Sequence, residues 1–214
     1  WHGFCWRDSF QKPGPLSFCP PVLRIKLMPD QLLAIKLYPP ALRPDLVSRP
    51  QLVEKLNYGL SQDTCLTLVS APAGYGKTTL VREWLAGSGR PFAWLSLERS
   101  ENYPGQFLRY LLSALNQATI LAKPSSFQSS SADPQEIHNQ LLDLINQIAS
   151  QDAPFILILD DYHTITEFDV HAIVEFLITH CPPCLHLVII TRQDPLLPLS
   201  KLRAPRLVTE VRLS

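Results

Sequence analysis

Residues 71–79 read Ala71-Pro72-Ala73-Gly74-Tyr75-Gly76-Lys77-Thr78-Thr79, and this stretch decides the fold. Residues 65–70, directly before it, are apolar and partly β-branched, which predicts a buried strand. Residues 80–86, directly after it, have a helical pattern that we expect Gly87 to close. A strand, a glycine-rich turn, Lys-Thr and a helix are the layout of a phosphate-binding P-loop.

The chemistry of this loop follows from its residue types. Gly74 and Gly76 have no Cβ, so the backbone can bend tightly and turn its N–H groups toward phosphate oxygens. We expect Lys77 to bind the β- and γ-phosphates of a nucleotide and Thr78 to bind Mg²⁺ through its hydroxyl. The first position of the pattern G-x-x-x-x-G-K-[ST] is Ala71 rather than glycine. An ordinary glycine-rich turn between a strand and a helix is therefore the alternative interpretation.

Composition limits the classes of function. The chain has 214 residues, enough for one substantial α/β domain, and 46% of them are apolar, as in globular proteins. Its 19 basic and 19 acidic residues balance and form no basic block, which argues against nucleic-acid binding by this segment. The longest clean apolar run, residues 155–159, is too short to cross a membrane, and no secretory signal is visible. We therefore expect a cytoplasmic protein without a membrane partner.

The cysteines are few and unevenly spaced. There are five of them, and an odd number with this spacing does not suggest a disulfide framework, so we expect a reducing compartment. Residues 181–184 read Cys-Pro-Pro-Cys with His180 and His186 beside them, which is compatible with a metal site. The two prolines also fit a rigid turn that leads into a strand at 187–190, and we favour this interpretation.

Three segments are expected along the chain. Residues 1–27 show no helical or strand period, and Met28 is the only methionine, so we expect 1–27 to be a non-native or disordered extension. Residues 28–60 form a proline-rich lead-in and an amphipathic helix at 51–60 that contribute to the nucleotide site. We expect residues 61–214 to form a P-loop NTPase core.

Strands alternate with helices through this core. We expect a mobile serine-rich loop at 123–132, strands at 65–70, 91–97, 155–159, 185–191 and 206–213, and helices at 80–86, 107–118, from 133 onward, at 170–178 and at 199–204. This alternation predicts an α/β fold with a five-stranded, mainly parallel sheet and helices on both faces.

The second half of a nucleotide site is expected after the third of these strands. Residues 155–159 end in Asp160-Asp161, the Walker B arrangement. We expect this strand to run beside the P-loop strand, so that both open onto one crevice. Asp160 is then expected to hold Mg²⁺, and Asp161 to orient or deprotonate the attacking water. Paired acids at the end of a strand also occur as a helix cap with a solvated neighbour.

Two further side chains are candidates for the same crevice. Arg192 ends the next strand, where it can sense a γ-phosphate through charge-assisted hydrogen bonds, the alternative being a plain surface arginine. His163 follows the paired acids by two residues and either polarises water or caps the local turn. The sequence does not decide between these two roles.

Together these motifs resemble one family. Residues 70–79, Trp-Leu-Ser-Leu at 94–97, Phe-Leu-Arg-Tyr-Leu at 107–111 and Asp-Asp-Tyr-His at 160–163 are similar to the ATPase domain of MalT-like, LuxR-type bacterial regulators. These regulators are signal-transduction ATPases with numerous domains, within the AAA+/NACHT-like P-loop NTPases. The lead-in and residues 191–195 also match, so the resemblance covers residues 28–214.

The resemblance implies a function and a site. ATP or ADP with Mg²⁺ is the implied cofactor, with Val47 to Arg49 near the adenine and Arg192 as the sensor arginine. Glu98 stands where the family often has aspartate. Such proteins continue into a lid, a helical-repeat sensor region and a DNA-binding helix-turn-helix, so DNA binding is implied only through a C-terminal domain outside this chain, and self-association only for the full-length protein. The implied activity is a slowly hydrolysing ATP switch. A nucleotide-locked scaffold and a different P-loop enzyme, such as a small-molecule kinase, are the alternatives.

Overall fold

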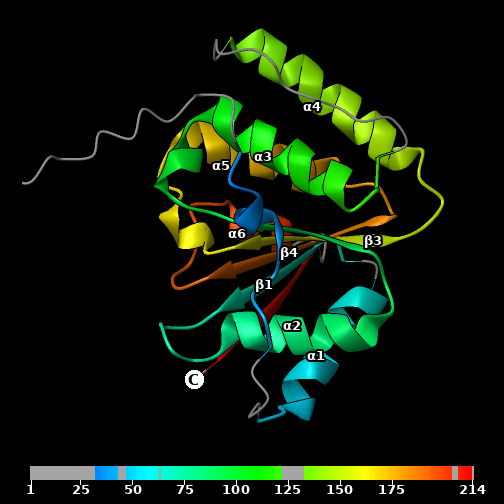
Figure 1. Cartoon of the computed structure of the whole chain (residues 1–214), viewed down its shortest axis with the longest axis vertical. Coiled ribbons are helices and arrows are strands. Elements are labelled where there is room, and N and C mark those ends of the chain that lie inside the picture. Colours follow the sequence, from blue (N-terminus) through cyan, green and yellow to red (C-terminus); the bar gives the residue numbers. More distant parts are fainter. Residues whose placement is uncertain (1–31, 43–46, 63, 122–132, 204–206, 214) are drawn as a thin grey trace, which may run out of the picture. The chain divides into compact units, whose positions relative to one another are not determined.

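The computed structural model describes residues 32–42, 47–62, 64–121, 133–203 and 207–213 (Figure 1). The predicted extension at 1–27 and the predicted serine-rich loop at 123–132 lie outside these residues. None of the helices in the described part of the chain has the length and apolar character needed to cross a lipid bilayer.

One five-stranded sheet forms the centre of the domain, in the order β2-β3-β4-β1-β5. All neighbouring pairs of strands are parallel, which confirms the predicted fold class. The strands are β1 (Leu66–Ser70), β2 (Phe92–Ser96), β3 (Phe155–Asp160), β4 (Leu185–Thr191) and β5 (Val208–Arg212).

One detail of the predicted sheet is wrong. β3 does not run beside β1, because β4 lies between them and pairs with both. The register aligns Ser70 of β1 with Thr191 of β4, and Leu159 of β3 with Ile189 of β4. Parallel strands end at the same edge of a sheet, so the carboxyl ends of β1 and β3 still open onto one crevice.

Helices cover both faces of the sheet (Figure 1). Below it in that view lie α1 (Pro50–Ser61) and α2 (Lys77–Ser88), and above it lie α3 (Pro104–Gln117), α4 (Pro134–Ala149) and α5 (Phe168–Thr179). The shorter helices are η1 (Ala34–Leu37), η2 (Arg99–Asn102), η3 (Tyr162–Thr164) and α6 (Leu199–Arg203).

The sheet is buried on both faces. Every residue of β1, β3 and β4 is buried, which explains why these strands read as continuous apolar runs rather than alternating ones. On the α1–α2 side, Trp84 and Trp94 are the largest side chains of the core. On the other side, Phe107, Phe155 and Tyr162 fill the space between the sheet and its helices.

Local signals at the helix ends were predicted with mixed success. Asp133 caps α4, because its carboxylate accepts a hydrogen bond of 3.0 Å from the backbone N–H of Gln135, and Pro134 is the first helical residue. Gly87 does not close α2, which continues to Ser88. Gly89 ends it instead, with a φ of 64° that glycine adopts without strain.

The cysteines are arranged differently from the prediction. Cys65, before β1, forms a disulfide with Cys181, before β4. The two residues are 116 positions apart and meet because β1 and β4 are neighbours in the sheet, which the number and spacing of cysteines does not reveal. The prolines of the Cys-Pro-Pro-Cys stretch form the favoured turn, in which the N–H of Leu185 donates to the carbonyl of Pro182 at 2.9 Å.

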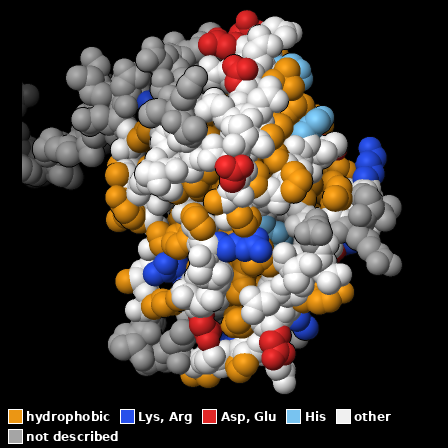
Figure 2. Space-filling view, turned by 90° about the vertical axis from the view of Figure 1, so that its right-hand side faces the viewer, with side chains coloured by type: hydrophobic (Ala, Val, Ile, Leu, Met, Phe, Trp, Pro, Cys, Tyr) orange, Lys and Arg blue, Asp and Glu red, His pale blue; other side chains and the backbone are white. Residues whose placement is uncertain are grey.

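This disulfide lies at the edge of the sheet where the strands begin. Figure 2 views the molecule from the side of Figure 1 at which β3 starts, and hydrophobic side chains there surround a few basic ones. A cavity of about 570 Å³ is lined by both disulfide cysteines, Arg90 and His186, among others. Within the described ranges no three His, Cys, Asp or Glu side chains are grouped so that they could hold a metal ion.

Candidate nucleotide site

The P-loop joins β1 to α2 at the edge where the strands end. Gly74 and Gly76 have φ values of 84° and 74°, a region that side chains of L-residues rarely adopt. No heavy atom lies within 4 Å of the position that a Cβ at Gly74 would take. Glycine is therefore required at position 74 by the backbone conformation and not by crowding, and the space beside it is open. The first turn of α2 follows directly, and such a turn offers backbone N–H groups to an anion.

Lys77 is the first residue of α2 and is buried against its own loop. Its ammonium donates hydrogen bonds to the carbonyl oxygens of Ala71, at 2.8 Å, and Pro72, at 2.9 Å. Burial lowers the pKa of Lys77, and the positive charge of Arg192 lowers it further. An anion brought to this ammonium would offset both effects, so the environment of Lys77 favours a negatively charged ligand.

Thr78 and Asp160, the two expected Mg²⁺ ligands, lie within hydrogen-bond distance of each other. The Thr78 hydroxyl lies 3.2 Å from Oδ2 and 3.3 Å from Oδ1 of the Asp160 carboxylate. Asp160 is 3% exposed, and burial, together with the charge of Asp161, raises the pKa of Asp160 to about 6. A hydroxyl and a carboxylate are hard oxygen ligands of the kind that Mg²⁺ prefers, and a cation would offset the cost of ionising Asp160. The pair therefore fits a Mg²⁺ ion.

Asp161, Arg192 and His163 form a second cluster beside this pair. The Asp161 carboxylate lies 3.9 Å from Nη2 of Arg192 and 3.8 Å from Nδ1 of His163. Asp161 makes no capping hydrogen bond to η3, which separates it from the cap interpretation. Its backbone has a φ of 53°, which is uncommon outside glycine and often marks a functional position. Arg192 is half-exposed but contacts Asp161, so it is not an isolated surface arginine.

His163 stays without a defined role. Burial lowers the pKa of His163, and the charge of Arg192 lowers it further, so the neutral ring is favoured. Its Nδ1 is buried and has no hydrogen-bond partner, and Asp161 is only within ion-pair distance. The ring therefore does not cap the turn through this nitrogen.

A cavity of about 400 Å³, which we call the Asp160 cavity, opens between the P-loop helix and β3. Two groups of residues line it: residues 40–42 of the lead-in, and the side chains of Thr78, Thr79, Arg82, Ser96, Asp160 and Asp161. The lead-in therefore forms one wall of the space beside the predicted metal ligands.

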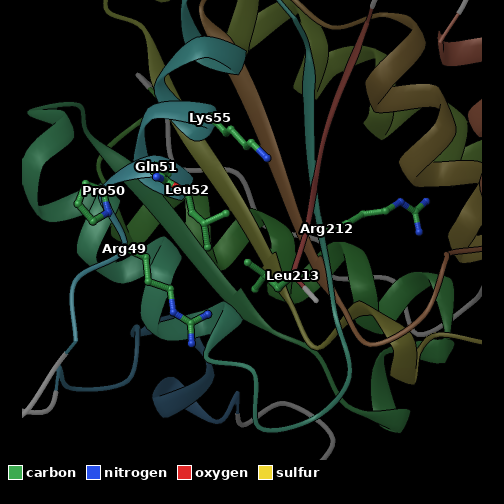
Figure 3. A pocket seen from close by; sticks show the side chains of 7 residues that line it. All are labelled: Arg49, Pro50, Gln51, Leu52, Lys55, Arg212 and Leu213. Atoms are coloured by element: carbon green, nitrogen blue, oxygen red, sulfur yellow. The ribbon is translucent and has the colours of Figure 1, made fainter.

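A second cavity, which we call the Arg49 cavity, lies at the start of α1 (Figure 3). It has a volume of about 530 Å³, and Leu52 and Leu213 point toward one another into it from α1 and from the chain just after β5. Arg212 also lines the cavity, although its guanidinium is directed away from Leu52 and Leu213 in Figure 3. Arg49 joins this cavity to the P-loop, because its Nη1 donates to the carbonyl of Tyr75 at 2.9 Å. The remaining lining residues are Pro50, Gln51 and Lys55.

The family described as AAA ATPase domain matches residues 47–190 of the chain, about two-thirds of its length. The chain belongs to the AAA ATPase domain family. The matched range contains the P-loop and both paired acids, whereas residues 32–42 and Arg192 lie outside it.

Individual relatives of this AAA ATPase domain confirm the resemblance to MalT-like regulators. It is 34% identical over 188 residues to the HTH-type transcriptional regulator MalT of Cronobacter sakazakii, covering 84% of this chain and 20% of that protein. It is 32% identical over 179 residues to MalT of Vibrio cholerae, covering 82% and 19%. The chain thus spans about a fifth of the length of these relatives.

A solved structure supports the fold of the AAA ATPase domain. The crystal structure of Cdc6p from Pyrobaculum aerophilum superimposes with a TM-score of 0.55 at 15% identity, covering 86% of this chain and 49% of that one. At this level of identity the likeness concerns the fold alone.

Sequence reasoning located some residues of the site and missed others. The structure places Arg49 against the P-loop, but Val47 is 79% exposed and does not line the Arg49 cavity. Arg82 was missed, although its position four residues after Thr78 puts it on the same face of α2. Ser96 and residues 40–42 were also missed, because no local pattern relates them to the P-loop.

Proposed function

We propose that this chain is the ATP-binding and slowly hydrolysing switch domain of a larger bacterial transcriptional regulator. The observation that carries the proposal is the convergence of Lys77, Thr78, Asp160 and Asp161 at one edge of the sheet, beside a turn whose glycines have positive φ values. The names of the MalT relatives support the regulatory role.

Phosphate binding would fall to residues 71–79. The backbone N–H groups of the loop and the first turn of α2 would hold phosphate oxygens, with Lys77 as the full positive charge among them. Thr78 and Asp160 would hold Mg²⁺, which when bound neutralises charge on the phosphates. The ammonium of Lys77 already lies inside the loop, so only its two carbonyl contacts need to lengthen when it binds a phosphate.

The Arg49 cavity would receive the nucleoside. Its volume of about 530 Å³ lies within the range of small-molecule sites, roughly 300–1,000 Å³, and Leu52 and Leu213 offer apolar surface to a base. Arg49 contacts the P-loop from this side, so a base there would be continuous with phosphates at Lys77. This geometry supports ATP or ADP as the ligand, with Arg49 rather than Val47 as the contact from the lead-in.

Hydrolysis would depend on Asp161. Its carboxylate lies next to Asp160 at the mouth of the Asp160 cavity, where it can accept a proton from water or orient it. Arg192 already lies within 4 Å of this carboxylate and could move to a γ-phosphate, which ADP lacks. Contacts that exist with ATP but not with ADP are what a nucleotide switch requires. Asp161 is about half-exposed, and water around it weakens its electrostatic effect, which is consistent with slow turnover.

We expect the whole regulator to interact with DNA and with copies of itself through further parts of the protein. The full sequence has no excess of positive charge, which supports DNA binding through another part of the protein. Self-association driven by ATP would likewise be a property of the full-length protein.

A nucleotide-locked scaffold is the second candidate. The contact of Asp161 with Arg192 favours it, because a carboxylate held by an arginine is less free to orient the attacking water. A single-turnover experiment with this chain in excess over ATP and Mg²⁺ separates the two. The switch predicts slow but complete conversion to ADP and phosphate, whereas the scaffold predicts bound ATP that persists.

A further inference from the structure

Residues 32–42 of the lead-in form a strap across the edge strand of the sheet. The strap contains η1, which packs against β2, and in Figure 1 it passes in front of the sheet from the layer of α3 to the layer of α1 and α2. Leu32 and Leu37 pack against the apolar core. The last residues of the strap, 40–42, line the Asp160 cavity.

Lys36 fastens this strap through charge. Its ammonium lies 2.9 Å and 3.1 Å from the two carboxylate oxygens of Glu101, 3.0 Å from the carboxylate of Glu98 and 3.1 Å from the hydroxyl of Ser100. An ammonium has three N–H donors, and these three residues provide an acceptor for each. The ring of Tyr110 lies on a further side, with its centroid 4.9 Å from the nitrogen.

The Lys36–Glu101 ion pair is deeply buried, whereas Glu98 is 65% exposed. Lys36 is 4% exposed and Glu101 is fully buried, although neither residue belongs to the P-loop or to the paired acids. Burial alone would lower the pKa of Lys36, but hydrogen bonds to Glu101 and Glu98 outweigh it and raise the pKa above its ordinary value. A buried ion pair is costly to form and persists only when every partner is satisfied. Apolar packing of Leu32 and Leu37 alone would hold the strap without the free-energy cost of burying two charges. We therefore infer that the charged contacts of Lys36 serve another purpose.

We propose that Lys36 is a positioning residue that holds residues 40–42 as a wall of the Asp160 cavity and thereby retains the metal and the terminal phosphate of the bound nucleotide. The inference rests on the proposed nucleotide binding. Lys36 does not line the cavity itself and acts through the three residues that separate it from Pro40. The strap faces Thr78 and the paired acids rather than the Arg49 cavity, so its loss affects the metal and terminal-phosphate end of the nucleotide and spares the nucleoside end.

The test compares two ligands in two single variants. Lys36→Met keeps most of the aliphatic stem and removes the charge, and Lys201→Met, at an exposed lysine of α6, is the matched control. Affinities are measured by calorimetry for Mg-ATP and for ADP in the presence of a chelator. Because the strap of Lys36→Met is detached from β2 most of the time, this variant binds Mg-ATP about tenfold more weakly than the wild type. Its affinity for metal-free ADP is unchanged. Lys201→Met changes neither affinity.

A double variant guards against loss of the fold. Lys36→Met leaves Glu101 buried without its cation, so Lys36→Met/Glu101→Gln removes both charges and is measured in parallel. Hydrogen exchange reports the strap directly, through the amides of Leu33, which donates to Tyr110, and of Lys36, which donates to Leu33. Both amides exchange faster in the two Lys36 variants.

The outcomes separate this inference from the proposed function. A wild-type chain that binds neither nucleotide contradicts the proposed function and the inference with it. If the wild-type chain binds both nucleotides, the proposed function stands. The positioning role is then overturned if the Lys36 variants keep the wild-type affinity for Mg-ATP, or if they lose affinity for both nucleotides equally. Unchanged exchange in the strap overturns it as well.

Discussion

His186 makes the stability of this domain depend on pH. The side chain lies in β4, is 3% exposed, and has its two ring nitrogens 2.8 Å from the carbonyl oxygen of Thr64 and 2.9 Å from the hydroxyl of Thr67. A carbonyl oxygen only accepts, so Nδ1 carries the proton and Nε2 accepts from the hydroxyl. The neutral ring is therefore fully satisfied, and burial lowers the pKa of His186 to about 4.

The size of the effect follows from this value. The ordinary pKa of histidine, 6.5, applies to the unfolded chain, so between 6.5 and about 4 the unfolded chain binds a proton that the folded domain does not. The free energy of unfolding therefore falls as the pH falls through this window. The whole difference corresponds to about 3 kcal/mol, of which about 2 kcal/mol is lost on going from pH 7.5 to about pH 5.

Urea denaturation at a series of pH values measures this loss. His186→Gln removes the titration and keeps an amide that can donate to Thr64 and accept from Thr67, so its stability should fall by about 2 kcal/mol less than that of the wild type between the same pH values. His138→Gln, at an exposed position of α4, should keep the wild-type dependence. Equal pH dependence in the wild type and in His186→Gln would refute the reasoning.

Two further substitutions, Gly74→Ala and Asp161→Asn, test the site, and Gly87→Ala is the comparison for the first. Gly74→Ala places a side chain at a φ of 84°, so it should lower the free energy of unfolding by about 1 kcal/mol and weaken nucleotide binding. Gly87→Ala lies inside α2 with open space around it, so it should raise the free energy of unfolding by about 0.5–1 kcal/mol in the same urea assay. Asp161→Asn should keep Mg-ATP bound, because Asp160 and Thr78 remain, but slow single-turnover hydrolysis by about a hundredfold through loss of the acid–base group. An unchanged rate of phosphate release would show that Asp161 does not act on the water.

Much of this site could be predicted from sequence because its parts are local signals. The glycines at 74 and 76 had to adopt a backbone that other residues avoid, and the lysine and threonine follow them at fixed positions on a helix. The acids at 160 and 161 come at the end of a short apolar run that is typical of a strand covered on both faces. Such features depend on residues that are close in sequence, so they can be recognised without knowledge of the rest of the fold.

The remaining features depend on contacts between distant parts of the chain. Nothing in β1 or β3 alone shows that β4 lies between them, and the Cys65–Cys181 disulfide follows from that same strand order. The contact of Arg49 with the P-loop and the fastening of Lys36 to Glu101 join the lead-in to segments far along the chain. A lysine in a proline-rich stretch gives no sign of being buried, because its partner is visible only once the strap is folded against β2.

Calorimetric titration of Lys77→Ala with Mg-ATP tests most directly whether this domain binds ATP through its P-loop. Lys77 is the only full positive charge within residues 71–79, so its removal should weaken binding at least tenfold, about 1.4 kcal/mol or more. A melting curve checks that loss of its hydrogen bonds to Ala71 and Pro72 leaves the domain folded, and Lys201→Ala serves as the matched control. Weak binding by Lys77→Ala beside wild-type binding by Lys201→Ala is the predicted result. Wild-type affinity in folded Lys77→Ala would contradict the assignment of residues 71–79 as the phosphate-binding loop.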